Sequence, residues 1–245
     1  MYICYNTNNI CCPFDNSIEC PISETNYFRF PQNNNLSVTT NEIISTKNNI
    51  REDLRIPVFK GNIRPDILKN INSNIENDIL EFKTEMESAA DDQAQQDKSS
   101  GRVFTPYEIS NSYVVTYNKN NLLSLSLIYE QLINNKASYI RTTYNYDLNT
   151  GTSMPLKYLF KDNSNYLEAL NKKIREKLQT DQNLYFPNVL NSFKGVAPDQ
   201  PYYLDDNDLV IFFRFSEIAP IASDIPVIRI PYSELKDILK PNLLK

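Results

Sequence analysis

The stretch that decides the fold is residues 202–239, YYLDDNDLVIFFRFSEIAPIASDIPVIRIPYSELKDIL. It predicts a strand, an acidic turn, a strand over residues 209–215, a Pro-bounded loop, a strand over residues 226–230 and a short helix over residues 233–239. The turn at residues 205–208 lacks the Gly and distal Glu of a helix-loop-helix calcium site. Because Asp and Asn tolerate left-handed backbone, we interpret it as a hairpin turn and expect no metal there.

A long amphipathic helix is predicted upstream of this stretch. Pro65 suits a first helical turn, and apolar residues then recur at steps of three and four as far as Ala90. This pattern predicts a helix of about 25–30 residues with one buried stripe. Its other face is acidic, because residues 63–98 contain nine acidic and four basic side chains and so account for the whole net charge of −5.

Three strand-like runs follow, roughly at residues 103–118, 122–134 and 137–149. Their short links predict an antiparallel meander. A second amphipathic helix is expected to begin near Asp162 or Ser164, with a stripe from Tyr166 to Leu178. The predicted class is therefore α+β: an antiparallel meander with one long and one medium amphipathic helix packed on it, and a short C-terminal helix.

Composition narrows the functional classes. Histidine is absent, which excludes His-dependent nucleophile systems and removes the commonest metal ligand. No basic patch is evident, so nucleic acid is not an expected partner, whereas a basic protein is electrostatically favoured. The longest apolar run, residues 209–213, is too short to span a bilayer, and the N-terminus shows no basic start or continuous apolar segment of a signal peptide.

The N-terminal segment contains every cysteine: Cys4, Cys11, Cys12 and Cys20. Four cysteines allow three pairings, and sequence does not choose among them. The adjacent pair fits a zinc site poorly. We expect unpaired thiols, disulfides or intermolecular crosslinks rather than a metal site, in a weakly structured segment over residues 1–51.

Candidate binding residues are Tyr202, Tyr203, Glu217 and Asp224. The two tyrosines belong to a large set on or beside strands, and tyrosine offers both contact area and a polar tip, although it is also a common strand residue. Glu217 and Asp224 flank a loop between two strands, the kind of segment that carries sites. As a carboxylate pair they also form the only hydrolase candidate, since the pairs Glu81/Glu85 and Glu87/Asp91 share the charged face of a helix.

Residues 217–222 (EIAPIA) and 230–236 (IPYSELK) resemble the C-terminal half of the RsiV-like module, a two-part extracytoplasmic module of Gram-positive bacteria. The module occurs in the lysozyme-binding anti-sigma factor RsiV and ahead of the catalytic domain of the peptidoglycan deacetylase PdaC. The segment 155–160 (PLKYLF) resembles a turn in the same half. Upstream, 55–61 (RIPVFKG), the long helix and the meander resemble the first half.

The resemblance implies a first half over residues 52–151, a second half over residues 152–245, and a location outside the cytoplasm or on a spore or cell surface. It implies non-enzymatic binding of a cell-envelope component, either a basic protein such as lysozyme or peptidoglycan, with no cofactor. We see no sigma-binding region and no deacetylase domain, so we expect neither activity. A structural protein of a spore or surface layer, crosslinked through its cysteines, and a carboxylate hydrolase are the alternatives.

Overall fold

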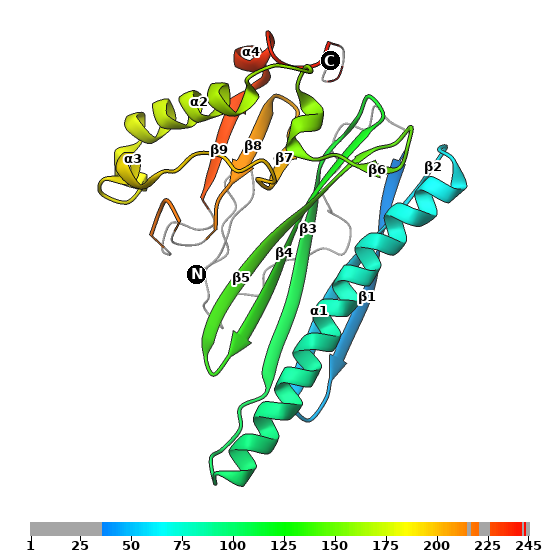
Figure 1. Cartoon of the computed structure of the whole chain (residues 1–245). Helices are drawn as coiled ribbons and strands as arrows, with labels where there is room; N and C mark the ends of the chain where they lie inside the picture. Colours follow the sequence, from blue (N-terminus) through cyan, green and yellow to red (C-terminus); the bar gives the residue numbers. More distant parts are fainter. Residues whose placement is uncertain (1–35, 215–216, 221–225, 242, 244–245) are drawn as a thin grey trace, which may run out of the picture.

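The computed structural model describes residues 36–214, 217–220, 226–241 and 243, and it confirms the α+β class (Figure 1). A six-stranded sheet has the order β1-β2-β3-β4-β5-β6, and a three-stranded sheet has the order β7-β8-β9. The elements are β1 (Leu36–Thr46), β2 (Ile50–Gly61), α1 (Pro65–Ser99), β3 (Tyr107–Lys119), β4 (Leu122–Ile133), β5 (Lys136–Asp147), β6 (Thr152–Ser153), α2 (Tyr166–Thr180), α3 (Val189–Ser192), β7 (Tyr202–Leu204), β8 (Asp208–Phe212), β9 (Val227–Pro231) and α4 (Tyr232–Leu235).

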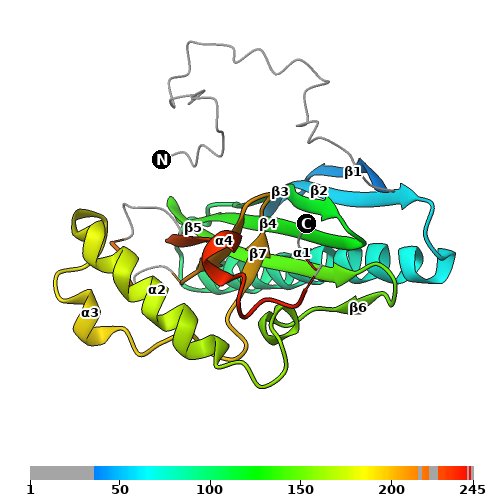
Figure 2. The same ribbon diagram turned by 90° about the horizontal axis from the view of Figure 1, so that it is seen from above.

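Helix α1 covers one face of the six-stranded sheet (Figures 1 and 2). Its stripe of Ile67, Ile71, Ile75 and Ile79 is between 0% and 4% exposed and joins the core beneath β2, β3 and β4. Burying an isoleucine side chain contributes about 2 kcal/mol, so this stripe is enough to hold the helix in place. At 35 residues, α1 is longer than the predicted 25–30.

Strand β1 corrects the prediction that residues 1–51 are weakly structured. Residues 36–46 pair with β2 without interruption, from Leu36↔Gly61 to Thr46↔Arg51. This strand is difficult to predict from sequence because it is an edge strand with polar side chains at most positions. Only Leu36 is fully buried. The four cysteines lie outside the described residues.

The sheet is mixed, because β2 and β3 are parallel over residues 50–53 and 107–110, with α1 as the crossover between them. The predicted meander β3-β4-β5 is antiparallel throughout. Its two hairpins turn at Asn120-Asn121 and Asn134-Asn135, all four with positive φ of 50–60°. Asn tolerates this conformation, which two-residue hairpins require at both central positions.

The three-stranded sheet packs on the opposite face of the large sheet from α1. Ser124 of β4 accepts a hydrogen bond from the Leu204 backbone N–H (2.9 Å) and donates one to Asn145 (2.7 Å). Asn145 in turn donates to the Tyr202 carbonyl (2.8 Å). These buried bonds tie β7 to one end of β4 and β5, and no element of the described residues covers the other end of this sheet face.

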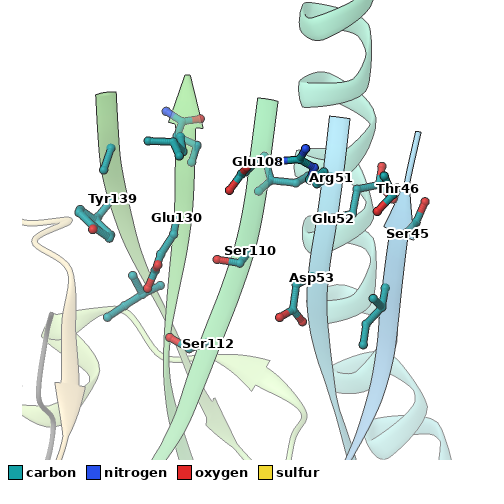
Figure 3. Close-up of a pocket in the computed structure, with 16 residues that line it drawn as sticks. Ser45, Thr46, Arg51, Glu52, Asp53, Glu108, Ser110, Ser112, Glu130 and Tyr139 are labelled. Carbon is teal, nitrogen blue, oxygen red and sulfur yellow. Dashed lines mark hydrogen bonds and ion pairs between the residues drawn. The ribbon is translucent and has the colours of Figure 1, made fainter. Parts of the chain in front are cut away.

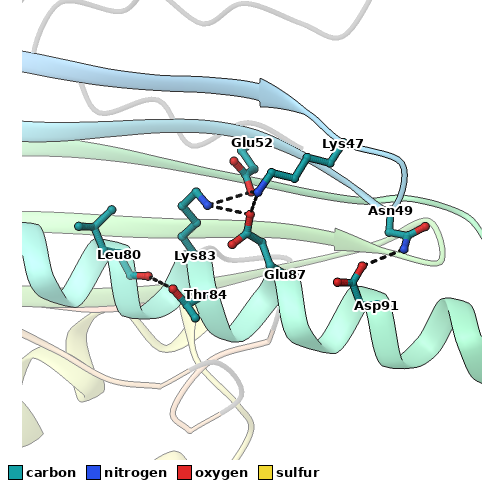
Figure 4. A network of polar contacts seen from close by, with 8 residues as sticks. All are labelled: Lys47, Asn49, Glu52, Leu80, Lys83, Thr84, Glu87 and Asp91. Carbon is teal, nitrogen blue, oxygen red and sulfur yellow. Dashed lines mark hydrogen bonds and ion pairs between the residues drawn. The ribbon is translucent and has the colours of Figure 1, made fainter.

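An ion cluster joins α1 to the β1–β2 hairpin (Figure 4). Lys83 Nζ lies 2.7 Å from Glu87 and 3.4 Å from Glu52, and Lys47 contacts the same two carboxylates. Burial raises the pKa of Glu52, whose side chain has no solvent exposure. Burial also acts to raise the pKa of Glu87, but hydrogen bonds from Lys47 and Lys83 outweigh it and hold that pKa at about 2.

Candidate binding groove

The uncovered end of the large sheet forms an open groove of about 760 Å³. We call this surface the open face. It consists of side chains at alternate positions of five strands, directed away from α1: Ile44, Thr46, Arg51, Asp53, Glu108, Ser110, Ser112, Ile128, Glu130, Leu132, Ala137 and Tyr139. The intervening residues, such as Ile109, Leu127 and Tyr129, point into the core under α1. Strand alternation therefore separates a buried apolar face from an open face of mixed polar and apolar side chains.

Strand register aligns one row of side chains across the groove. The partners are Ile44↔Asp53, Asp53↔Ser110, Ser110↔Glu130 and Glu130↔Tyr139. Figure 3 shows these labelled side chains from Asp53 to Tyr139 on successive strands, with α1 behind the sheet. Because neighbouring strands lie about 4.8 Å apart, the backbones of Asp53 and Glu130 are roughly 10 Å apart, with the Ser110 hydroxyl between them.

The charges of the open face are unequally compensated. Arg51 forms an ion pair with Glu108 (2.5 Å), and Arg55, beside the groove, lies 3.5 Å from Asp53. One Asp53 carboxylate oxygen, Oδ1, has no hydrogen-bond partner among the described residues. The Glu130 carboxylate has neither an ion pair nor a hydrogen bond within the described chain, and burial raises its pKa.

A second cleft, of about 660 Å³, adjoins the open face, and Tyr139 lines both. It lies between β5, the loop before β7 and the end of β8. The Arg141 guanidinium, 9% exposed, lies 5.8 Å from the Tyr203 ring and 5.6 Å from the Phe212 ring. Glu217 lies at the rim of this cleft.

The predicted site residues do not lie together on the open face. Tyr202 is 3% exposed and its hydroxyl donates to the Met154 carbonyl (2.8 Å), while Tyr203 is 4% exposed beneath Arg141. Both tyrosines are packing residues in the free protein. Glu217 is exposed and its carboxylate accepts a hydrogen bond from the Arg214 backbone N–H (2.9 Å). Asp224 lies outside the described residues, so the pair with Glu217 stays a prediction.

The acidic turn at residues 205–207 is a hairpin, as predicted. Asp205 N–H donates to the Asp208 carbonyl (3.0 Å), and the Asp205 carboxylate pairs with Arg229 of β9. Among the described residues, no group of three or more His, Cys, Asp or Glu side chains is arranged to hold a metal ion. No helix in the same part of the chain is both long and apolar enough to cross a membrane.

Comparison with known proteins now identifies the architecture. Residues 43–133 match the family described as Deacetylase PdaC, and residues 157–233 match a protein family of unknown function, DUF3298. The chain contains a two-part PdaC/DUF3298 module. This confirms the resemblance carried by residues 217–222 and 230–236, and it indicates a cell-envelope-associated module of unknown function.

Solved structures with the same fold include two DUF3298 family proteins. One, from Bacteroides fragilis, is 16% identical, with a TM-score of 0.66, covering 84% of this chain and 94% of its own. The other, from Pseudomonas aeruginosa, is 17% identical, with a TM-score of 0.58, covering 85% of this chain and 95% of its own. At these identities the similarity establishes the fold of the PdaC/DUF3298 module alone. No curated protein matches the chain.

Sequence reasoning missed the residues of the open face. The alternation of Glu108, Ser110 and Ser112 with buried residues was a usable signal for a polar strand face. What brings Asp53 into the same row is the parallel pairing of β2 with β3, across a 35-residue helix. That pairing has no local sequence signature. Within the PdaC/DUF3298 module, the groove belongs almost entirely to the PdaC-matching part, since only Ala137 and Tyr139 fall outside residues 43–133.

Proposed function

We propose that this PdaC/DUF3298 module is a non-enzymatic binding module that recognises a basic protein of the cell envelope, such as lysozyme, on its open face. The observation that carries the proposal is a sheet face that no described element covers, with a groove of about 760 Å³ and more acidic than basic side chains among its described lining residues. A broad sheet face offers many contacts at once to a partner without enclosing a small substrate. This geometry favours grasping a macromolecule.

Charge supports a cationic partner. Among the described lining residues, three carboxylates point into the groove, those of Asp53, Glu108 and Glu130, and they outnumber the lining base Arg51 together with Arg55 beside the groove. The whole chain also has a net charge of −5. Complementary charge steers encounter and suppresses wrong partners. Peptidoglycan, whose stem peptides end in carboxylates, is disfavoured on this face by the same argument.

The lack of catalysis is part of the proposal. Glu217, the described member of the predicted hydrolase pair, is exposed and held by a backbone N–H rather than by a proton-transfer partner. A general acid or base needs to reach its substrate together with a second group. On the open face, Glu130 and Asp53 flank a serine on a shallow surface, an arrangement suited to electrostatic recognition.

Isothermal titration calorimetry of the full chain tests the proposal with three probes. Native lysozyme is expected to bind, and lysozyme whose lysines have been succinylated, which reverses their charge, is expected not to bind. Soluble muropeptides are the third probe. Absence of heat with native lysozyme, or equal affinity for native and succinylated lysozyme, would overturn recognition of a basic protein. Binding of muropeptides alone would assign the module to peptidoglycan instead.

A further inference from the structure

The least explained side chain on the open face is Glu130. It lies half-buried near the C-terminal end of β4, yet within the described chain its carboxylate has no ion pair and no hydrogen bond. Partial burial of a charge without a partner costs free energy in the free protein. The flanking β4 residues Leu127 and Tyr129 point to the other face, into the core under α1, so Glu130 does not fill that core.

The neighbours of Glu130 form a receptor for a cation. In the same cross-strand row lie Ser110, a hydroxyl acceptor, and Asp53, whose Oδ1 atom is buried and has no hydrogen-bond partner among the described residues. On the other side is Tyr139, an aromatic ring directly opposite Glu130 on β5. Two carboxylates, a hydroxyl and an aromatic ring suit an ammonium or guanidinium group with an aliphatic stem.

We propose that the row of Asp53, Ser110, Glu130 and Tyr139 is a subsite that receives one lysine or arginine side chain of a protein partner. This inference rests on the proposed function and specifies how the open face selects its partner. The cationic group lies between Asp53 and Glu130, where the Ser110 hydroxyl accepts a hydrogen bond. The aliphatic stem packs on the Tyr139 ring.

The charges around the row favour this subsite over the rest of the groove. Glu108 is already neutralised by Arg51 at 2.5 Å, and Asp53 shares Arg55 with Glu42 at 3.5 and 3.7 Å. Among the described carboxylates that line the groove, Glu130 is therefore the one without a cation beside it, and an incoming cation compensates its charge most fully. A charge-assisted hydrogen bond formed there is worth about tenfold to a hundredfold in affinity.

Glu130→Gln tests the subsite, because it preserves the shape of the side chain and removes its charge. Asp53→Asn is the second variant. The matched control is Glu85→Gln, which removes the same charge from the exposed face of α1, on the other side of the sheet. The probes are native lysozyme and two peptides, hexalysine and its fully acetylated form.

The Glu130→Gln variant is expected to bind lysozyme and hexalysine about tenfold or more weakly, while Glu85→Gln stays within about twofold of wild type. The same variant is expected to be as resistant to urea as wild type, or more so, because it loses an unpaired charge. Weaker binding with equal or higher stability is a result that a structural role for Glu130 does not produce. Acetylated hexalysine is expected not to bind.

Failure of the subsite and failure of the proposed function are distinguishable. Unchanged lysozyme affinity in both Glu130→Gln and Asp53→Asn overturns the subsite and leaves the binding function standing. Binding of hexalysine that depends on Glu130, without any binding of lysozyme, supports the subsite and overturns lysozyme as the partner. Dimers that dissociate in Glu130→Gln would assign the open face to a second copy of the chain, and so overturn the inference.

Discussion

Lys83→Met perturbs the ion cluster between α1 and the β1–β2 hairpin with little change in packing. Methionine keeps most of the aliphatic stem and removes the ammonium group. The variant leaves two carboxylates, Glu52 and Glu87, with Lys47 as the remaining cation. Glu52 is the critical group, because its side chain has no solvent exposure and Lys47 lies 3.9 Å from it, compared with 3.4 Å for Lys83.

The expected loss of unfolding free energy depends on whether the buried Glu52 carboxyl group stays charged or becomes protonated. Removing one partner of a buried ion pair costs about 3–5 kcal/mol when the remaining charge stays buried. Protonation offers an alternative, and for a glutamate with an ordinary pKa of about 4.3 it costs roughly 3.7 kcal/mol at pH 7 and roughly 1 kcal/mol at pH 5. Since Lys47 remains, we expect losses of about 2–3 kcal/mol at pH 7 and under about 1 kcal/mol at pH 5.

Urea unfolding of Lys83→Met, followed by circular dichroism at both pH values, measures these losses. Lys173→Met is the matched control, because its ammonium bridges Glu176 and Glu234 at the surface, and we expect no resolvable change. Adding Glu52→Gln to Lys83→Met is expected to restore part of the stability. Equal losses at pH 5 and pH 7 would refute the electrostatic reasoning and indicate lost packing.

Three further predictions concern the sheet and the groove. Asn111→Ala is expected to lower the free energy of unfolding by about 2 kcal/mol in urea titrations, because the buried Asn111 amide accepts a hydrogen bond from the Arg55 N–H (2.7 Å) and donates one to the Arg55 carbonyl (2.9 Å). The control, Asn70→Ala on the exposed face of α1, is expected to change it little. Asn145→Ala is expected to cost about 2 kcal/mol and to speed hydrogen exchange in β7, since it leaves the Tyr202 carbonyl unpaired; unchanged exchange would contradict this role. Because burial raises the pKa of Glu130, its charge is lost at a higher pH on acidification than that of an exposed glutamate. Calorimetric affinity for hexalysine is therefore expected to fall at a higher pH in wild type than in Glu130→Gln, and the same onset of the fall in both proteins would contradict this.

Local sequence patterns predicted those helices and hairpins whose formation depends on neighbouring residues in the chain. The isoleucine stripe of α1 repeats at helical spacing, and the hairpins turn at asparagine pairs whose positive φ matches the short links. The hairpin between β7 and β8 could be predicted for the same reason. Each of these features depends on residues that are close together in the chain.

Long-range features could not be predicted in this way. The pairing of β2 with β3 spans α1, and it continues beyond residue 53 through the Asn111 side chain rather than through the backbone ladder. Alternation along β3 and β4 was a signal for the strand faces of Ser110 and Glu130, but it does not fix which residue of β2 lies beside them. The row on the open face depends on the register of β2 with β3 and on that of β3 with β4, so only the structure could identify it.

Placing a bulky side chain in the middle of the groove tests most directly whether the open face is the binding surface. Ser110→Trp fills the centre of the row, and Thr84→Trp, on the exposed face of α1, is its control. We expect Ser110→Trp to weaken lysozyme binding by more than about tenfold in calorimetric titrations while the urea midpoint stays near that of wild type. Thr84→Trp is expected to bind as wild type does. Unchanged affinity in a folded Ser110→Trp variant would contradict the assignment of this face.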